Sequence, residues 1–161
     1  MSEENKTSWK DPESPEIDMM LPAIEMQLSL VGSRGWKARK KAMVASGDKF
    51  KESPKEYQEH CIQLEYSYRP QNYAELIKVH TLAELYWIRE RLVRAVGYRT
   101  NRELKLGHNP DKAGKWKDQE IRMFNMLDKA IIRNEDTLMR LQGYRKQKKP
   151  STDEVRNDLM K

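Results

Sequence analysis

Apolar residues recur at helical spacing in three stretches of the chain, and each stretch has its own start signal. The first opens with Ser53, followed by Pro54 and Glu56, a capping box with proline in the first turn. The apolar positions that follow, at spacings of four, three and four, are Tyr57, Cys61, Leu64 and Tyr68. This spacing predicts a helix that runs to about Arg69 and stops before Pro70.

The second stretch predicts the longest continuous apolar stripe. Asn72 begins it, and Glu75 three residues later completes a second capping box. The stripe continues at least to Val96, which corresponds to about 37 Å of helix at 1.5 Å per residue. Gly97 is predicted to bend or end this helix, and residues 99–106 can extend it.

The third stretch predicts a helix from about Lys115 to Gln142, which Gly143 is placed to end. Its stripe alternates by three and four, as in a coiled coil, and consists of Phe124, Leu127, Ile131, Asn134, Leu138 and Leu141. A loop at 108–114, with turn residues Asn109 and Pro110, separates it from the second helix. The two long helices should therefore pack as an antiparallel hairpin, with the helix from Ser53 as a third member.

The chain divides into four predicted regions. Residues 1–17 read as a flexible acidic arm, and residues 18–47 as short helices that include a basic segment. Residues 53–143 form the helical bundle, and residues 144–161 a basic, polar tail. No strand pattern or internal repeat is visible, so the predicted fold is all-α with disordered ends.

The composition suggests that the bundle has a thin core. Hydrophobic residues make up 37% of the chain and charged residues 35%, against about 45–50% and 25% in typical domains. Either the bundle completes its burial against another copy or a partner, or its helix faces are simply solvated. We predict self-association through the third helix, by Leu127, Ile131, Asn134, Leu138 and Leu141. Asn134 would fix the register there if it is buried, or face water if it lies at the edge.

Two basic segments flank the predicted bundle in a chain of net charge +6. The first comprises Arg34, Trp36, Lys37, Arg39, Lys40 and Lys41, and the second comprises Arg145, Lys146, Lys148 and Lys149. Such clusters neutralise phosphates and release counterions, which gives salt-dependent binding with little sequence preference. They indicate a nucleic-acid partner, DNA in preference to RNA. The alternative is a solvated face and a solubilising tail.

The sequence contains no recognisable catalytic, metal or cofactor motif. His60, His80 and His108 do not recur at metal-ligand spacing, and Cys61 is the only cysteine. Neighbouring His60 and Cys61 would point about 100° apart on a helix, so they form no dyad. We therefore expect a non-enzymatic protein without cofactor. A single thiol, no signal peptide and no apolar run of membrane length predict a cytoplasmic protein with no membrane contact.

From Glu52 to Arg145 the chain resembles a class of uncharacterised bacterial helical proteins. The similar segments are 52–54 with Tyr57, 82–89, and 138–142 with Arg145. This resemblance implies no particular activity.

The order of parts also resembles phage terminase small subunits, in which a basic DNA-binding segment precedes an oligomerising helical hairpin and a tail that meets the large subunit. The chain departs from that plan because only segments 22–31 and 36–46 are available for a helix-turn-helix before Ser53. This departure weighs against sequence-specific reading of DNA.

Two function hypotheses follow. The first is a non-enzymatic, self-associating nucleic-acid-binding protein, such as the DNA-recognition subunit of a phage packaging or mobile-element machine. The second is a protein–protein adaptor or a structural subunit of a larger assembly that makes no contact with nucleic acid.

Overall fold

The computed structural model describes residues 15–30, 39, 41, 43 and 52–148, and this part of the chain is all-α with no strand. Its helices are α1 (Pro15–Leu30), α3 (Pro54–Tyr68), α4 (Tyr73–Lys105), α5 (Pro110–Ala113) and α6 (Asp118–Lys148). Arg39, Lys41 and Met43 are also helical. The predicted fold class is confirmed. Residues 1–14 of the predicted arm and residues 149–161 of the predicted tail lie outside the described residues, whereas residues 15–17 of the arm belong to α1.

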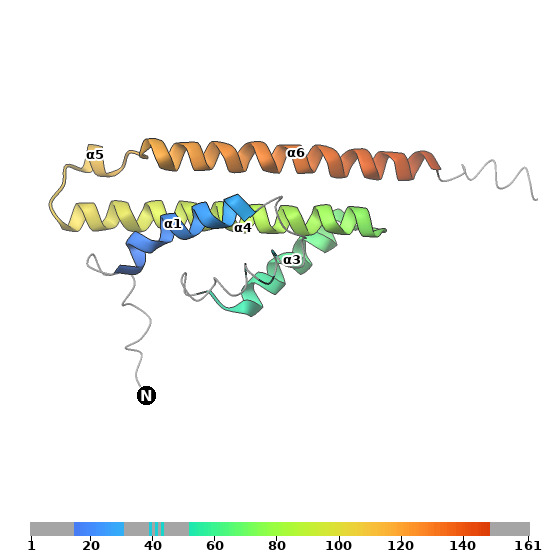
Figure 1. Cartoon of the computed structure of the whole chain (residues 1–161), viewed down its shortest axis with the longest axis horizontal. Helices are drawn as coiled ribbons and strands as arrows, with labels where there is room; N and C mark the ends of the chain where they lie inside the picture. The colour runs from blue at the N-terminus through green and yellow to red at the C-terminus, as the bar shows by residue number, and fades with distance from the viewer. Residues whose placement is uncertain (1–14, 31–38, 40, 42, 44–51, 149–161) are drawn as a thin grey trace, which may run out of the picture.

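The two long helices form the predicted antiparallel hairpin (Figure 1). The turn between them contains α5, and α6 runs back along α4 for most of its length. Helices α1 and α3 also pack against α4. Both contact α6 as well, since Gln119 donates to Glu25 of α1 and Gln142 donates to the Tyr68 carbonyl of α3. Helix α4 is therefore the central element, and α6 packs mainly against α4.

Local capping sets where the helices begin, as the sequence predicts. The Ser53 side chain accepts a hydrogen bond from the Glu56 backbone N–H, and the Glu56 carboxylate accepts from the Ser53 N–H at 2.9 Å. At the start of α4, Asn72 Oδ1 accepts from the Glu75 N–H at 2.9 Å. Each contact satisfies a backbone donor that has no partner within its helix.

The end of α6 differs from the prediction, because the helix continues through Gly143 to Lys148. Helix α4 does not end at Gly97 but takes the predicted extension and runs to Lys105. A helical glycine costs only about 1 kcal/mol relative to alanine, which the packing of a long helix can offset. The chain leaves α4 instead at Gly107, whose φ of 82° favours glycine.

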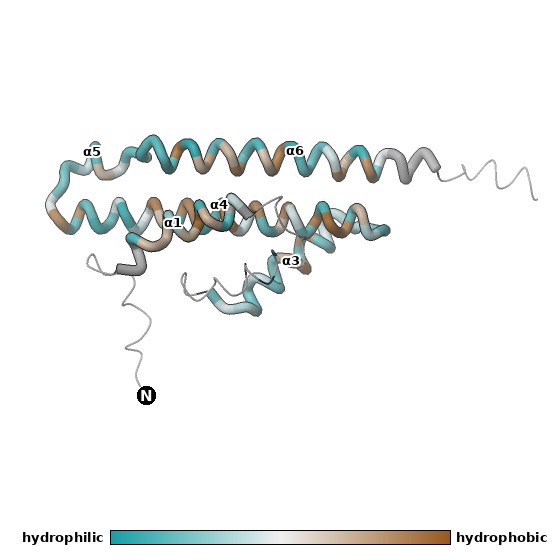
Figure 2. Tube along the Cα trace, viewed as in Figure 1, coloured by the Kyte–Doolittle hydropathy of each residue, from teal (hydrophilic) through white to brown (hydrophobic). Residues whose placement is uncertain are grey.

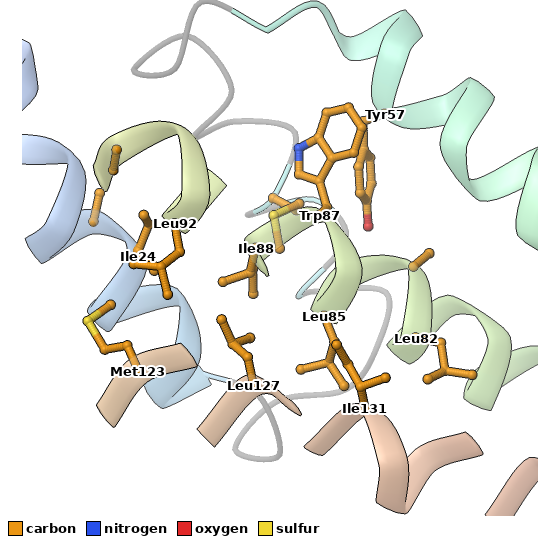
Figure 3. Packing of buried hydrophobic residues seen from close by; sticks show 14 of the residues in the cluster. Ile24, Tyr57, Leu82, Leu85, Trp87, Ile88, Leu92, Met123, Leu127 and Ile131 are labelled. Carbon is orange, nitrogen blue, oxygen red and sulfur yellow. The ribbon is translucent and has the colours of Figure 1, made fainter. Parts of the chain in front are cut away.

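The core lies between α4 and its neighbours. Leu82, Leu85, Ile88 and Leu92 of α4 are fully buried, and Figure 3 shows them facing α6 and α1. The Tyr57 ring of α3 packs edge-on against Trp87 of α4, with ring centroids 5.4 Å apart. Figure 2 shows hydrophobic bands alternating with hydrophilic ones along both long helices, so each keeps a polar surface as well as an apolar stripe.

Candidate functional site

Helix α4 carries a buried arginine that joins four parts of the chain. Arg91 is 1% exposed and donates to both carboxylate oxygens of Glu52, with a shortest distance of 2.6 Å. It also donates to Gln27 of α1 at 2.9 Å and to the Met43 carbonyl at 3.3 Å. Trp87 adds a hydrogen bond to Glu52 at 2.7 Å. A buried carboxylate with this many donors is a structural anchor, since its lone pairs are already occupied.

A second buried ion pair lies one to two turns earlier on α4. Arg39 Nε donates to Glu84 at 2.9 Å, and its Nη2 donates to Thr81 at 3.2 Å. Burial raises the pKa of Glu84 above its ordinary value, while Arg39 acts in the opposite direction. The pair attaches Arg39 to α4.

A third network closes the end of the hairpin. Arg99 donates to both carboxylate oxygens of Glu120 and to the carbonyls of Ala113 and Lys115. It also pairs with Glu103 at 3.1 Å, and Lys117 binds Glu103 from the other side at 3.0 Å. Every nitrogen of the Arg99 guanidinium therefore has a partner, and the network holds the loop rather than offering a reactive group.

Two of the three histidines are likewise engaged within the fold. His60 Nε2 lies 3.0 Å from the Ala83 carbonyl, and His80 Nε2 lies 2.7 Å from a Glu65 carboxylate oxygen. No group of three or more potential metal ligands is found among the described residues. No described helix has the length and hydropathy needed to cross a membrane.

The surface of α6 that faces away from α4 carries a row of cations. Arg122, Lys129, Arg133 and Arg140 are exposed, and none of their side chains pairs with a described residue. At 100° per residue they lie within an arc of about 40°, roughly opposite the buried leucines of α6. Two exposed acids, Asp118 and Asp136, share the same side. We call this surface the α6 outer face, and its net charge is positive.

The first predicted basic segment is placed only in part. Arg39 is 8% exposed and bonded to Glu84, so its guanidinium lies in the interior and not on a nucleic-acid-binding surface. Lys41 is exposed. The other members of this segment lie outside the described residues: Arg34, Trp36, Lys37 and Lys40.

The second predicted basic segment belongs largely to the last turns of α6. Arg145, Lys146 and Lys148 are helical, although their side chains are outside the described part, as is all of Lys149. The predicted tail therefore begins within α6, which ends at Lys148. Its sequence adds further positive charge after Arg140.

The residues predicted for self-association are used within the chain instead. Leu127 and Leu138 are fully buried and Ile131 is 5% exposed, and all three belong to the hydrophobic core. Figure 3 shows Leu127 and Ile131 facing α4. Leu141 is half-buried. Asn134 is also half-buried, donates to the Ala130 carbonyl at 2.8 Å and accepts from Lys78 at 3.3 Å. This stripe builds the hairpin, so it is not a free surface for a second copy.

Sequence reasoning missed the cations of the α6 outer face. Their spacing of seven, four and seven residues is a readable signal once the apolar stripe has been identified. They are scattered among acids and amides in the sequence, whereas the flanking segments are contiguous runs.

No family model matches the chain, and no match is found among curated proteins or among solved structures.

Proposed function

We propose that this is a non-enzymatic nucleic-acid-binding protein whose main contact surface is the α6 outer face. The observation that carries the proposal is a set of four exposed cations that no described side chain neutralises: Arg122, Lys129, Arg133 and Arg140. The flanking segment of Arg145, Lys146, Lys148 and Lys149 continues this charge in sequence.

The spacing of these cations suits a phosphate backbone. From Arg122 to Arg140 the row is about 27 Å long at 1.5 Å per residue. Because the side chains are free in the folded protein, contact with phosphates breaks no internal ion pair and releases condensed counterions. The cations outnumber Asp118 and Asp136 on the same face by two to one. We expect binding to duplex DNA with little sequence preference, because the row contains no base-reading motif.

The test compares two variants with the same net charge. In the first, Arg122, Lys129, Arg133 and Arg140 are all changed to Gln. In the matched control, four exposed cations on α3, α4 and α5 are changed to Gln: Lys55, Arg69, Lys105 and Lys112. Fluorescence anisotropy with a labelled duplex over a salt series gives the affinity and its salt slope.

The α6 variant should lose most of its affinity, and its log–log salt slope should fall by about 0.9 for each phosphate contact removed. The control should keep the slope of the unmodified protein. Equal losses in both variants, or binding that does not depend on salt, would contradict the proposal. Absence of binding would favour the adaptor hypothesis, for which Ile62 and Tyr66 of α3 are exposed apolar contacts at 55% and 75%.

A further inference from the structure

The charges on the α6 outer face have a nearly symmetric order. Reading along the helix, they are Asp118, Arg122, Lys129, Arg133, Asp136 and Arg140. All six are exposed, and none of their side chains pairs with a described residue. When the helix is read backwards about Lys129, the two aspartates exchange places with Arg122 and Arg140, whereas Arg133 takes the place of Asn125 and has no acidic counterpart.

This order is centred on Lys129. Arg122 and Asp136 lie seven residues to either side of it, and Asp118 and Arg140 lie eleven residues to either side. If two copies of α6 lie antiparallel with a two-fold axis at Lys129, Arg122 of each copy is level with Asp136 of the other. Asp118 is then level with Arg140. The four ion pairs fall about 10.5 and 16.5 Å from the axis at 1.5 Å per residue.

The apolar residues of the same face fit this arrangement. Met126 is 60% exposed and lies three residues before Lys129, while Ile132 is 58% exposed and lies three residues after it. At 100° per residue they lie about 60° to either side of Lys129, so they flank the interface at its two edges and do not meet across it. Partial burial at these edges supplies the non-directional part of the association.

The position of α6 in the fold leaves room for a second helix. Helix α6 packs mainly against α4, and the residues of the α6 outer face are exposed, so no described element covers this face (Figure 1). The buried stripe of α6 cannot serve, because Leu127 and Leu138 are fully buried against α4.

We propose that a second copy of this chain docks on the α6 outer face in an antiparallel, two-fold arrangement centred on Lys129. A self-complementary patch is what such an isologous interface requires. The dimer and the nucleic-acid complex use the same cations, so they exclude one another and nucleic acid separates the copies. The dimer does not depend on the proposed nucleic-acid binding, and the two are tested separately.

A charge swap tests the pairing. Arg122→Asp places two acids opposite each other, and Asp136→Arg places two bases opposite each other, so each single variant should weaken the dimer about tenfold or more. The double variant R122D/D136R restores opposite charges and should restore the dimer. Sedimentation velocity over a concentration series measures all four proteins. If the double variant is no better than the single variants, or the unmodified protein is monomeric at every concentration, the proposal is overturned.

Cross-linking tests the position of the axis. Lys129→Cys places two thiols at the axis, within reach of a disulfide, so mild oxidation should give covalent dimers. The matched variant Arg140→Cys should stay monomeric, because its copies stand about 33 Å apart along the helix at 1.5 Å per residue. The native Cys61 is buried and should not contribute. Equal cross-linking at both positions would rule out this axis.

Lys129→Leu separates the dimer from nucleic-acid binding. It removes a like-charge contact at the axis and adds apolar area there, so it should strengthen the dimer. The same change removes one phosphate contact and should weaken duplex binding. If both associations weaken together, the lysine acts in some other way and the dimer proposal fails.

Discussion

The two long helices have nearly the same length but opposite surroundings. Helix α4 has 33 residues and packs against α1, α3, α5 and α6, whereas α6 has 31 and is covered mainly by α4. On α4, charged side chains such as Arg91 and Glu84 are buried and form ion pairs. On α6 the cations of the outer face, such as Arg133, are exposed and unmatched among the described residues.

This difference shows that the place of a charged residue in a helical sequence does not by itself determine whether its side chain is buried or exposed. Arg91 and Arg133 both lie in the middle of a long helix, yet one anchors the fold and the other is free to bind. The number of neighbouring elements decides between these roles, because desolvated ions must be paired. Four sets of substitutions test this difference between the two helices.

The largest effect is expected from the two arginines. Arg91→Met should cost about 3–5 kcal/mol of unfolding free energy, because Glu52 loses its main buried partner. Arg133→Met should change the unfolding free energy by about 0.5 kcal/mol or less, since nothing in the fold depends on it. Urea unfolding monitored by circular dichroism measures both. Similar losses in the two variants would show that α6 is not free on its outer side.

The next effect comes from apolar residues one position apart on α6. Leu127 is fully buried and Met126 is 60% exposed. Leu127→Ala should cost about 2–5 kcal/mol through lost burial and a residual cavity. Met126→Ala should be close to neutral in the monomer. The urea midpoint at low protein concentration checks this, and a costly Met126→Ala would mean that this side of α6 is covered.

The carboxylates of α4 should respond to pH in opposite directions. Burial raises the pKa of Glu84, so its contribution to the free energy of unfolding falls as pH rises from about 4.5 through the folded pKa. Lys117, and then Arg99, hold the pKa of Glu103 below 4.5, so its contribution is present above that pH and lost below it. In urea titrations between about pH 3 and 7, Glu84→Gln should remove the loss at higher pH. Glu103→Gln should remove the loss at lower pH, and an unchanged profile in either variant would contradict its assignment.

The smallest effect is stabilising. Gly97 in α4 and Gly143 in α6 are both helical, and an added Cβ would meet no atom within 4 Å at either position. Alanine at each should raise the unfolding free energy by about 0.5–1 kcal/mol. Thermal melts of the two single variants measure this. A destabilised Gly97→Ala would indicate that α4 bends at this residue.

Much of the fold could be predicted because the local signals agree with the packing. Ser53 and Asn72 cap their helices as expected, and the stripe from Leu127 to Leu138 does form one side of the hairpin. The extension of α4 through Gly97 is predicted only as one of two alternatives, and that of α6 through Gly143 is not predicted, because tertiary packing outweighs a local propensity of about 1 kcal/mol.

The candidate surface was harder to predict because charge patterns do not reveal burial. Arg39 lies in a conspicuous basic run, yet its partner Glu84 is 45 residues away, and a contact at this separation leaves no local trace. The cations of the α6 outer face became recognisable only after the opposite side of the helix was known to pack on α4. The predictions of nucleic-acid binding and of self-association both remain to be tested.

The anchor at Arg91 also governs the order in which the chain can assemble. Its partners Gln27, Met43 and Glu52 all precede it in sequence, so they leave the ribosome earlier. Until Arg91 emerges, Glu52 has no buried cation to meet, and an early packed state of the N-terminal half would strand that carboxylate. The N-terminal helices therefore gain this anchor only once α4 has been synthesised, and their packing is expected to be completed late in synthesis.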